Sequence, residues 1–347
     1  MNMKKKVTIL LDKMPDDARY PIRRAQTIIQ QLANNVDVSV IVPKQYASCF
    51  ATSPAAVHHL ENGVMTTLQH LRPAVLLCDQ RLSKKEVVQR LRAFIPFIIH
   101  LDDMGEGRHE ANIALQTIAN DTGEQIPIAQ HEPDTHLFLV DQQLKEIAQQ
   151  RQQPAQETMP LHLVVMFSDY DPSRLTFRTL RHLIQLQIPL RITIVVGEHY
   201  AHDVMDLKMM ALQRNNTKVV QTNDYLKVAK DAHIILCSAT YFPYEVAAIG
   251  IPCIVLAEND AEMNGSFPTE QNGFLHLGLG RKVKQSILLN AVMEFVLHEG
   301  LRRKVVERQL AHAFNGENVL LDIIYTNLQD SNPPKNNPLE IETPNML

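Results

Sequence analysis

The feature that most constrains the fold is an alternation of short apolar runs with segments of helical periodicity. Runs such as VTILL at 7–11 and VLLC at 75–78 are apolar throughout, which is typical of strands buried on both faces of a sheet. Between such runs, segments like 22–33 place apolar residues three and four positions apart, as an amphipathic helix does. This order predicts an α/β fold in which helices cover both faces of parallel sheets.

The alternation is interrupted by a polar, glutamine-rich stretch between residues 141 and 160, which contains Pro154 and Pro160. A stretch without apolar runs is typical of a linker, and a second series of strands and helices follows it. The last residues are rich in proline and predict a disordered tail. We therefore expect an N-terminal domain over 1–145, a linker over 146–160, a C-terminal domain over 161–330 and a tail over 331–347.

Composition and charge exclude several classes of protein. The chain has 347 residues, of which 45% are hydrophobic and 21% charged, as in globular proteins. Its net charge of −4 gives no basic excess of the kind that favours nucleic acid or an anionic membrane. No apolar run approaches the length of a membrane span, and VTILL is too short for a signal-peptide core. We expect a cytoplasmic protein with no membrane span and no nucleic-acid partner.

The segment from 232 to 280 has the element order of a nucleotide-sugar site. It predicts a strand, a turn, a helix that carries Glu245, a Gly-Ile-Pro at 250–252, a second strand, and then Asn259. The turn reads Ser-Ala-Thr at 238–240, where phosphate-binding turns usually carry glycine because backbone N–H groups must approach the ligand closely. The segment therefore indicates a ligand class, while its turn lacks the usual phosphate-binding residues.

Five segments together resemble the spore-coat polysaccharide biosynthesis protein G family. That family includes the UDP-sugar hydrolase of pseudaminic acid biosynthesis and belongs to the GT-B glycosyltransferase-like superfamily. The resemblance implies two doubly wound, Rossmann-like domains with a cleft between them, a UDP or UDP-sugar ligand, and no metal or other cofactor. The five segments, in family order, are HLDDMGEGRHEANIAL at 100–115, DPSRLTFRTL at 171–180, ITIVVGEHY at 192–200, YEVAAIGIPCIVLAEND at 244–260 and FNGENVLLDII at 314–324.

The first site of the family is altered in this chain. The resemblance implies a Gly-x-Gly-His turn before the first helix, with the histidine as catalytic base and an arginine three residues later. Aligned on Arg23, the base position is held by Tyr20, and no glycine occurs between residues 17 and 20. Tyrosine, whose ordinary pKa is about 10, is a poor general base at neutral pH. We interpret Tyr20 as a packing residue or a polar wall of the cleft and leave the catalytic residue unassigned.

A second glycine turn of the family is also replaced. The family sequence Phe-Gly-Gly-Ser-Asp-Pro corresponds here to FSDYDP at 167–172. If Asp169 faced a diphosphate at about 4 Å, the two charges would repel by about 1 kcal/mol in water and about 4 kcal/mol at an effective dielectric of 20. The chain is therefore identified as a divergent member whose activity as an enzyme stays open.

The resemblance implies a set of nucleotide-binding residues around the third turn. Glu245 would accept hydrogen bonds from the ribose hydroxyls; the alternative is an exposed carboxylate that interacts favourably with its helix dipole. The Gly-Ile-Pro at 250–252 is predicted to end the helix and begin the next strand. The predicted nucleotide-binding residues are Ser238, Ala239, Thr240, Glu245 and Asn259.

Basic and acidic residues offer further candidates for ligand contacts. Arg19, Arg23 and Arg24 could bind phosphate in place of the missing glycines, since arginine suits bidentate phosphate contact; the alternative is a solvated helix start. Asp103 follows a predicted strand and could meet sugar hydroxyls, or with Asp102 hold a magnesium ion. The scattered histidines show no H-x-x-x-H or H-E-x-x-H pattern, and we predict no metal site.

Three functions stay open from the sequence. The first is a nucleotide-sugar-binding protein of surface or spore-coat polysaccharide biosynthesis, with or without the hydrolase activity of the family. The second is a non-catalytic partner or regulator of another polysaccharide-biosynthesis enzyme. The third is a glycosyltransferase in which the arginines of the first helix bind the donor phosphates.

Overall fold

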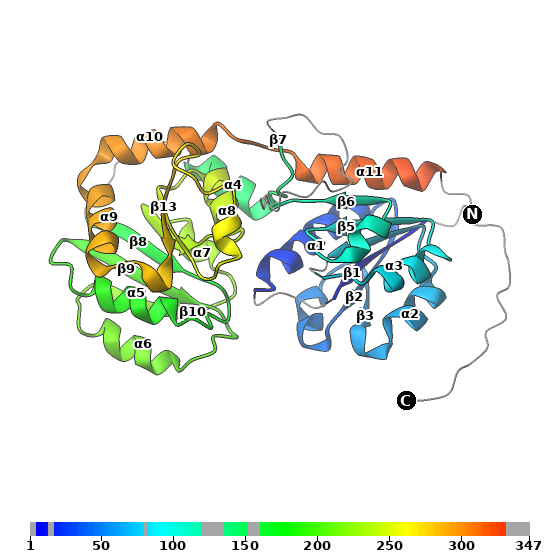
Figure 1. Ribbon diagram of the computed structural model, residues 1–347, viewed down its shortest axis with the longest axis horizontal. Coiled ribbons are helices and arrows are strands. Elements are labelled where there is room, and N and C mark those ends of the chain that lie inside the picture. Colours follow the sequence, from blue (N-terminus) through cyan, green and yellow to red (C-terminus); the bar gives the residue numbers. More distant parts are fainter. Residues whose placement is uncertain (1–4, 13–16, 80–81, 119–134, 152–159, 331–347) are drawn as a thin grey trace.

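The computed structural model describes residues 5–12, 17–79, 82–118, 135–151 and 160–330 (Figure 1). The described part forms two α/β domains, each built on a six-stranded, wholly parallel sheet. The predicted fold class is confirmed. The proposed tail at 331–347 and most of the predicted linker lie outside the described residues.

The first sheet has the strand order β3-β2-β1-β4-β5-β6. Helix α1 (Arg19–Leu32) covers one face, where the apolar stripe expected from its sequence is buried. Helices α2 (Val64–Leu71) and α3 (Lys85–Arg92) cover the other face. The strands are β1 (Lys6–Leu11), β2 (Asp37–Val42), β3 (Ala56–His59), β4 (Val75–Asp79), β5 (Phe97–Leu101) and β6 (Ile113–Leu115).

The second sheet repeats this topology with the order β10-β9-β8-β11-β12-β13. One face is covered by α5 (Leu175–Leu183), α6 (Val204–Ala211) and α9 (Gln285–Leu297). The other face is covered by α4 (Gln142–Arg151), α7 (Leu226–Ala229) and α8 (Phe242–Ile249). The strands are β8 (Leu161–Met166), β9 (Leu190–Val196), β10 (Thr217–Gln221), β11 (Ile234–Ser238), β12 (Cys253–Ala257) and β13 (Phe274–Leu279).

The chain passes between the two domains at two places that lie side by side. The short strands β7 (Thr135–His136) and β14 (Ala313–Phe314) pair in parallel at this crossing. After α10 (Glu299–Leu310), helix α11 (Gly316–Asp330) returns to the first domain and packs Leu320 and Ile324 into its core (Figure 1). Gly316 permits the tight return, because a Cβ there would lie 1.8 Å from the carbonyl oxygen of Leu137.

The same strand order in both sheets places β1 and β8 at equivalent positions, each followed by a helix. The carboxyl ends of β8 and β11 and the start of α1 meet at the domain boundary, where open parallel sheets bind their ligands. Among the described residues, no helix is both long and apolar enough to cross a bilayer.

Candidate functional site

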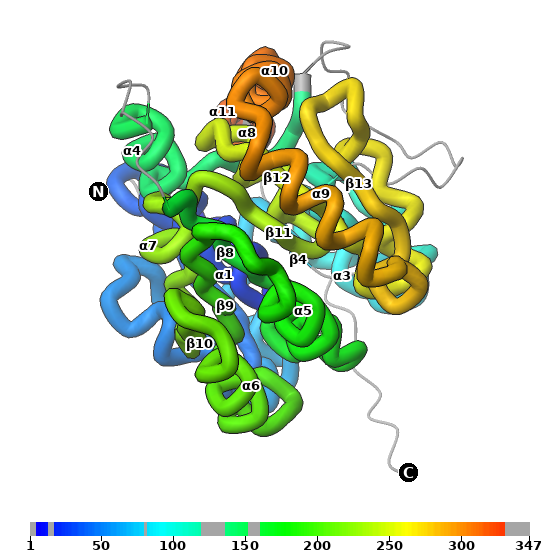
Figure 2. The backbone as a smooth tube through the Cα atoms, turned by 90° about the vertical axis from the view of Figure 1, so that its left-hand side faces the viewer, coloured from blue at the N-terminus to red at the C-terminus, as the bar shows by residue number. Residues whose placement is uncertain are grey.

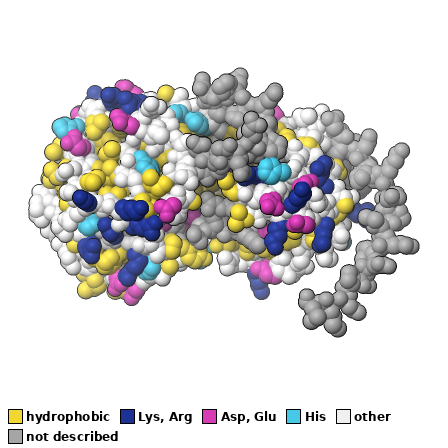
Figure 3. Space-filling view, viewed as in Figure 1, with side chains coloured by type: hydrophobic (Ala, Val, Ile, Leu, Met, Phe, Trp, Pro, Cys, Tyr) yellow, Lys and Arg dark blue, Asp and Glu magenta, His cyan; other side chains and the backbone are white. Residues whose placement is uncertain are grey.

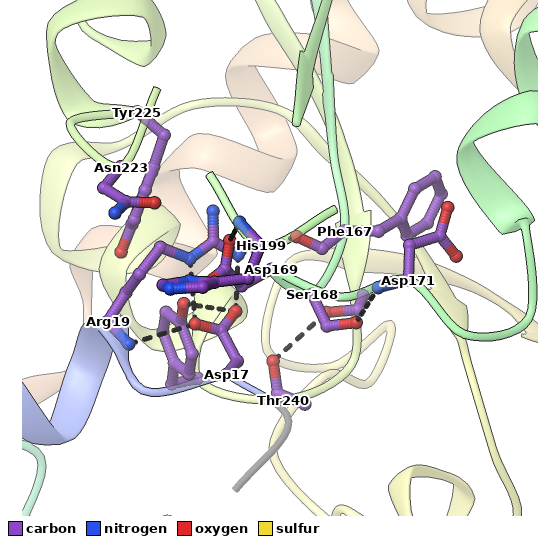
Figure 4. A network of polar contacts seen from close by, with 12 residues as sticks. Asp17, Arg19, Phe167, Ser168, Asp169, Asp171, His199, Asn223, Tyr225 and Thr240 are labelled. Atoms are coloured by element: carbon purple, nitrogen blue, oxygen red, sulfur yellow. Dashed lines mark hydrogen bonds and ion pairs between the residues drawn. The ribbon is translucent and has the colours of Figure 1, made fainter. Parts of the chain in front are cut away.

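The domain boundary is joined by a buried network around Arg19, at the first position of α1 (Figure 4). Arg19 donates from Nε to Asp17 Oδ1 at 2.8 Å and from Nη2 to the carbonyl oxygen of Phe167 at 2.8 Å. The hydroxyl of Tyr241, from the second domain, donates to Asp17 Oδ2 at 2.8 Å. Both Asp17 and Arg19 therefore bond to both domains.

One nitrogen of Arg19 stays without a partner. Nη1 is buried and makes no hydrogen bond to any described residue. The guanidinium carbon lies 5.0 Å from the ring centre of Tyr225 and 5.4 Å from that of Phe242, so aromatic faces stabilise its charge. This nitrogen is a free donor at the place where the sequence predicts a phosphate contact.

Glu245 is held by an arginine from the other domain. Arg23 Nη2 lies 2.9 Å from Glu245 Oε1, and its Nε donates to Asp141 Oδ2 at 2.7 Å. Arg23 Nη1 donates to the hydroxyl oxygen of Tyr225 at 2.6 Å, and that hydroxyl lies 2.9 and 2.7 Å from the two carboxylate oxygens of Glu245. The acid is thus satisfied entirely by side chains of this protein.

Glu245 is 1% exposed, so the alternative of a solvent-exposed helix carboxylate is wrong. Burial raises its pKa to about 7, although Arg23 and the Tyr225 hydroxyl stabilise the charged form. Gly250, in the left-handed conformation at φ 66°, ends α8 as the sequence predicts. With a pKa near neutrality, Glu245 can accept hydrogen bonds as a carboxylate or donate one as a carboxylic acid.

Arg24 faces the first domain only. Its Nε and Nη2 bind the two oxygens of Asp79 at 2.8 and 2.6 Å, a bidentate contact. Its Nη1 donates to Asp102 Oδ2 and Thr117 Oγ1, both at 2.5 Å. Each guanidinium nitrogen of Arg24 is therefore occupied, and the arginine ties the ends of β4 and β5 together. Neither Arg19 nor Arg24 belongs to a solvated helix start.

Tyr20 lies inside an aromatic stack. Its ring centre is 4.6 Å from that of Phe138 at an angle of 7° and 5.2 Å from that of Tyr241 at 19°. Its hydroxyl accepts a hydrogen bond from the backbone N–H of Leu139 at 3.4 Å. Burial raises the pKa of Tyr20 well above its ordinary value, against the opposing charge of Arg24. The geometry fits a packing residue and gives no general base.

Acidic side chains of the protein occupy backbone donors just after β8, β11 and β12. The N–H and hydroxyl of Ser168 donate to the two oxygens of Glu258 at 2.6 and 2.7 Å. The N–H groups of Ala239 and Glu258 donate to Glu262 Oε2 at 3.1 and 2.9 Å. Burial, and then the nearby charge of Glu262, raise the pKa of Glu258 to about 8.

Asp169 is buried beside β9, where its Oδ2 lies 2.7 Å from Nδ1 of His199. The residue at position 197 has to be glycine, because a Cβ there would lie 1.5 Å from Asp169 Oδ1. The backbone donors that the family resemblance assigns to diphosphate thus have acidic neighbours from the chain itself.

The other predicted nucleotide-binding residues lie at the same edge of the second sheet. The hydroxyl oxygens of Ser238 and Thr240 are 3.1 Å apart, and Ser238 is fully buried. Asn259 accepts from the N–H of Glu262 at 3.0 Å and donates to its Oε1 at 3.2 Å. Asn259 therefore orients Glu262, which in turn bonds to Ala239.

Asp103 lies apart from this network, within the first domain. It is bonded to the N–H and hydroxyl of Ser83, to the N–H of Gly105 at 2.8 Å, and to Nδ1 of His100 at 2.6 Å. Burial alone would raise its pKa, but these bonds lower it below the ordinary value. Its oxygens are taken by loop residues of its own domain. Within the described ranges, no group of three or more His, Cys, Asp or Glu could hold a metal ion.

Several partners in the network carry no signal in the sequence. Asp141 and Tyr225 lie far apart along the chain and meet Arg23 only because the domains meet. Asp17, two residues before Arg19, was part of the altered first turn but gave no sign of bonding to Tyr241. Glu258 and Asn259 were part of the site segment, but the role of Glu262 as a backbone acceptor depends on the turn geometry.

Comparison with known proteins gives few matches in sequence and many in fold. No described protein family matches the sequence. An uncharacterised protein of Methanocaldococcus jannaschii, MJ1062, is 18% identical over 211 residues, which cover 58% of this chain and 44% of that protein. The alignment therefore spans less than half of that relative.

Solved structures match over nearly the whole chain. MurG of Acinetobacter baumannii superposes with a TM-score of 0.67 at 14% identity, covering 93% of this chain and 99% of MurG. A putative UDP-N-acetylglucosamine 2-epimerase of Listeria monocytogenes gives 0.64 at 10% identity, covering 97% and 100%. MnaA of S. aureus, solved with UDP, gives 0.64 at 12% identity, covering 96% and 99%. The chain thus has the two-domain GT-B fold.

Proposed function

We propose that this protein binds a nucleotide sugar, with UDP as its nucleotide, at the boundary of its two domains. The role would lie in the cytoplasmic biosynthesis of a surface or spore-coat polysaccharide. The fold supports the ligand class, since the structural relatives include a UDP-N-acetylglucosamine 2-epimerase and a protein solved with UDP. The observation that carries the proposal is Glu245, a buried carboxylate at the start of α8, where the family resemblance expects the ribose acceptor.

Ligand binding would replace some contacts between side chains of the network by contacts with the nucleotide. Ribose hydroxyls would take the place of the Arg23 guanidinium and the Tyr225 hydroxyl on Glu245. Arg23 would then be free to bind phosphate together with the unpartnered Nη1 of Arg19. Because the Arg23–Glu245 contact crosses the boundary, the exchange requires the two domains to move apart. Binding is therefore coupled to domain opening.

The proposal includes binding and excludes the hydrolase mechanism of the family. Tyr20 stands where that mechanism needs a histidine base, and it is buried between two rings with a raised pKa. A group that is neutral and enclosed cannot accept a proton from water at neutral pH. We therefore expect that Tyr20 does not hydrolyse a bound UDP-sugar, and that the protein releases this ligand chemically unchanged.

Thermal unfolding with added nucleotides tests the proposal. UDP and UDP-N-acetylglucosamine should raise the Tm of the native protein in a concentration-dependent way, because they bind only the folded state. Glu245→Gln should weaken UDP binding by roughly ten- to a hundredfold, since hydrogen bonds to a charged group contribute about 1.5–3 kcal/mol. Glu270→Gln, an exposed acid of the same domain, is the matched control. No shift with any nucleotide would contradict the proposal.

A second candidate is a non-catalytic partner of another polysaccharide-biosynthesis enzyme. The observation that favours it is the occupation of the Ser168 and Ala239 backbone donors by Glu258 and Glu262. Backbone donors that are already bonded to the protein's own acidic side chains are not free to bind a diphosphate. Under this alternative, the native protein co-purifies with a glycan-synthesis enzyme and shows no nucleotide-dependent Tm shift.

A further inference from the structure

The outer side of the second domain carries a cluster of cations. Helix α5 lies between α6 and α9, and Figure 2 looks onto this side of the molecule. Arg174, Arg178 and Arg181 share the outward side of α5 because they are four and three positions apart. With three cations at and after the 3₁₀ turn Gly280–Lys282, they form what we term the basic face: Arg174, Arg178, Arg181, Arg281, Lys282 and Lys284.

Most of these cations have no acidic partner. Arg174 pairs with Asp206 at 3.2 Å and Arg281 with Asp260 at 3.1 Å. The other four make no ion pair with a carboxylate in the part of the chain that the structure describes. Six cations and two paired acids leave a local charge of 6 − 2 = +4 in a protein whose net charge is −4. The overall charge therefore hides a strongly positive surface.

Apolar side chains flank the basic face. Met205, Met209 and Leu212, on the outward side of α6, are 54%, 60% and 77% exposed. They lie opposite Leu207, which faces the core, and share the outward side of α6 with the exposed Asp206 and Lys208. Ile287, at the start of α9, is 47% exposed. Isolated exposed apolar residues are common, but the helices that carry these ones, α6 and α9, both pack against α5.

The most basic helix of the first domain, α3, also has exposed apolar neighbours, Leu82 and Val87 at 68% and 41% exposure, and differs in its charge balance. Lys84, Lys85, Arg90 and Arg92, at and within α3, are all exposed. Acidic residues lie among them: Glu86 is in the first turn of α3, and Lys85 pairs with Glu110 at 3.4 Å. Figure 3 shows the difference, with Lys and Arg gathered on the second domain and mixed with acidic side chains on the first.

We propose that the basic face, with its flanking apolar row, docks on the surface of an anionic lipid bilayer. Lipid phosphates attract the unpaired cations, and the methionine and leucine side chains enter the boundary between headgroups and acyl chains. Met side chains adapt readily to an irregular apolar surface. A soluble polyanion would match the cations but leave the apolar row in water. A bilayer satisfies both features, and α5 and α6 would lie along it.

Vesicle sedimentation tests the proposal with the full-length protein. It should bind vesicles of phosphatidylcholine mixed with phosphatidylglycerol and stay unbound with phosphatidylcholine alone. Binding should weaken with added salt, as the Debye length falls from about 10 Å at 0.1 M to about 3 Å at 1 M. Replacing Arg178, Arg181, Lys282 and Lys284 together by Gln should lower partitioning by roughly 600-fold, since each cation contributes about fivefold.

Two further variants make the test specific. Replacing Lys84, Lys85, Arg90 and Arg92 by Gln removes the same number of charges from the first domain and should change partitioning less than about threefold. The triple variant Met205→Ser, Met209→Ser and Leu212→Ser keeps every charge and should lose the binding that persists at high salt. Equal losses in the two charge variants would overturn the proposal, as would binding to heparin or polyglutamate without any binding to vesicles.

Discussion

The arginines of α1 and α5 occupy equivalent helices and have opposite surroundings. Each helix follows the third strand in the order of its six-stranded sheet, β1 in the first domain and β8 in the second. On α1, Arg19 and Arg23 lie at the domain boundary and Arg24 points into the first domain, and each meets at least one carboxylate. At the start of α5, Arg174 pairs with the exposed Asp206; within the helix, Arg178 donates to the carbonyl oxygen of Val283, and Arg181 is exposed and makes no ion pair with a described residue. The two helices thus differ in their surroundings: the arginines of α1 are enclosed among acidic side chains, whereas Arg174 and Arg181 at α5 are exposed to solvent.

The largest predicted difference between the two helices is in how much an arginine contributes to the free energy of unfolding. Arg24→Met should lower the free energy of unfolding by about 3–5 kcal/mol, because it leaves the buried Asp79 without its bidentate partner. Arg181→Met, on the exposed side of α5, should change it by less than about 0.5 kcal/mol. Urea denaturation of the two variants measures both values. Equal losses would show that the surroundings of the two helices do not differ as described.

Removing the Tyr20 ring from the aromatic stack should lower the free energy of unfolding by a similar amount, whereas removing only its hydroxyl should cost much less. Tyr20→Ala should cost about 3–5 kcal/mol, since it removes a fully packed ring from between Phe138 and Tyr241. Tyr20→Phe keeps the ring and loses the hydroxyl, with its long hydrogen bond from Leu139 and its interaction with Thr117, so its cost should be about 1 kcal/mol. Guanidinium denaturation provides the comparison. A large loss with Tyr20→Phe would indicate that the hydroxyl has a role beyond packing.

The raised pKa of Glu258, in the second domain, predicts a smaller effect: stability that depends on pH. The pKa of Glu258 is raised from its ordinary 4.5 to about 8, so the folded state holds a proton that the unfolded state releases. Its contribution to stability is therefore fully present below about pH 4.5 and is lost as the pH rises to about 8. Glu258→Gln should flatten the decline in Tm across this window. A native protein whose stability rises through the same window would contradict the assignment.

The fold could be predicted from the sequence because its signals are local. Uniformly apolar runs such as 7–11 and the stripe on 22–33 specify buried strands and an amphipathic helix without reference to distant residues. The return of α11 to the first domain could not be predicted in this way, since nothing within 316–330 states which sheet it covers. Only the three-dimensional structure shows that α11 packs on the first sheet, after the chain crosses back beside β7.

The site could be predicted only in part, for the same reason. Glu245 and the altered turns could be read from the sequence, because they lie in segments with a recognisable order of elements. The partners of Arg23, which are Asp141, Tyr225 and Glu245, come from three separate segments. The basic face was hidden because net charge averages over the chain, whereas an interaction surface depends on where helices such as α5 expose their charges.

A crystal structure of the protein grown with UDP tests the central claim most directly. The account predicts that UDP lies at the domain boundary, with ribose hydroxyls bonded to Glu245 and with Arg23 moved from that carboxylate to the phosphates. The domains should then be farther apart than in the present structure. UDP bound elsewhere while Arg23 keeps its contact of 2.9 Å with Glu245 would contradict the proposed site.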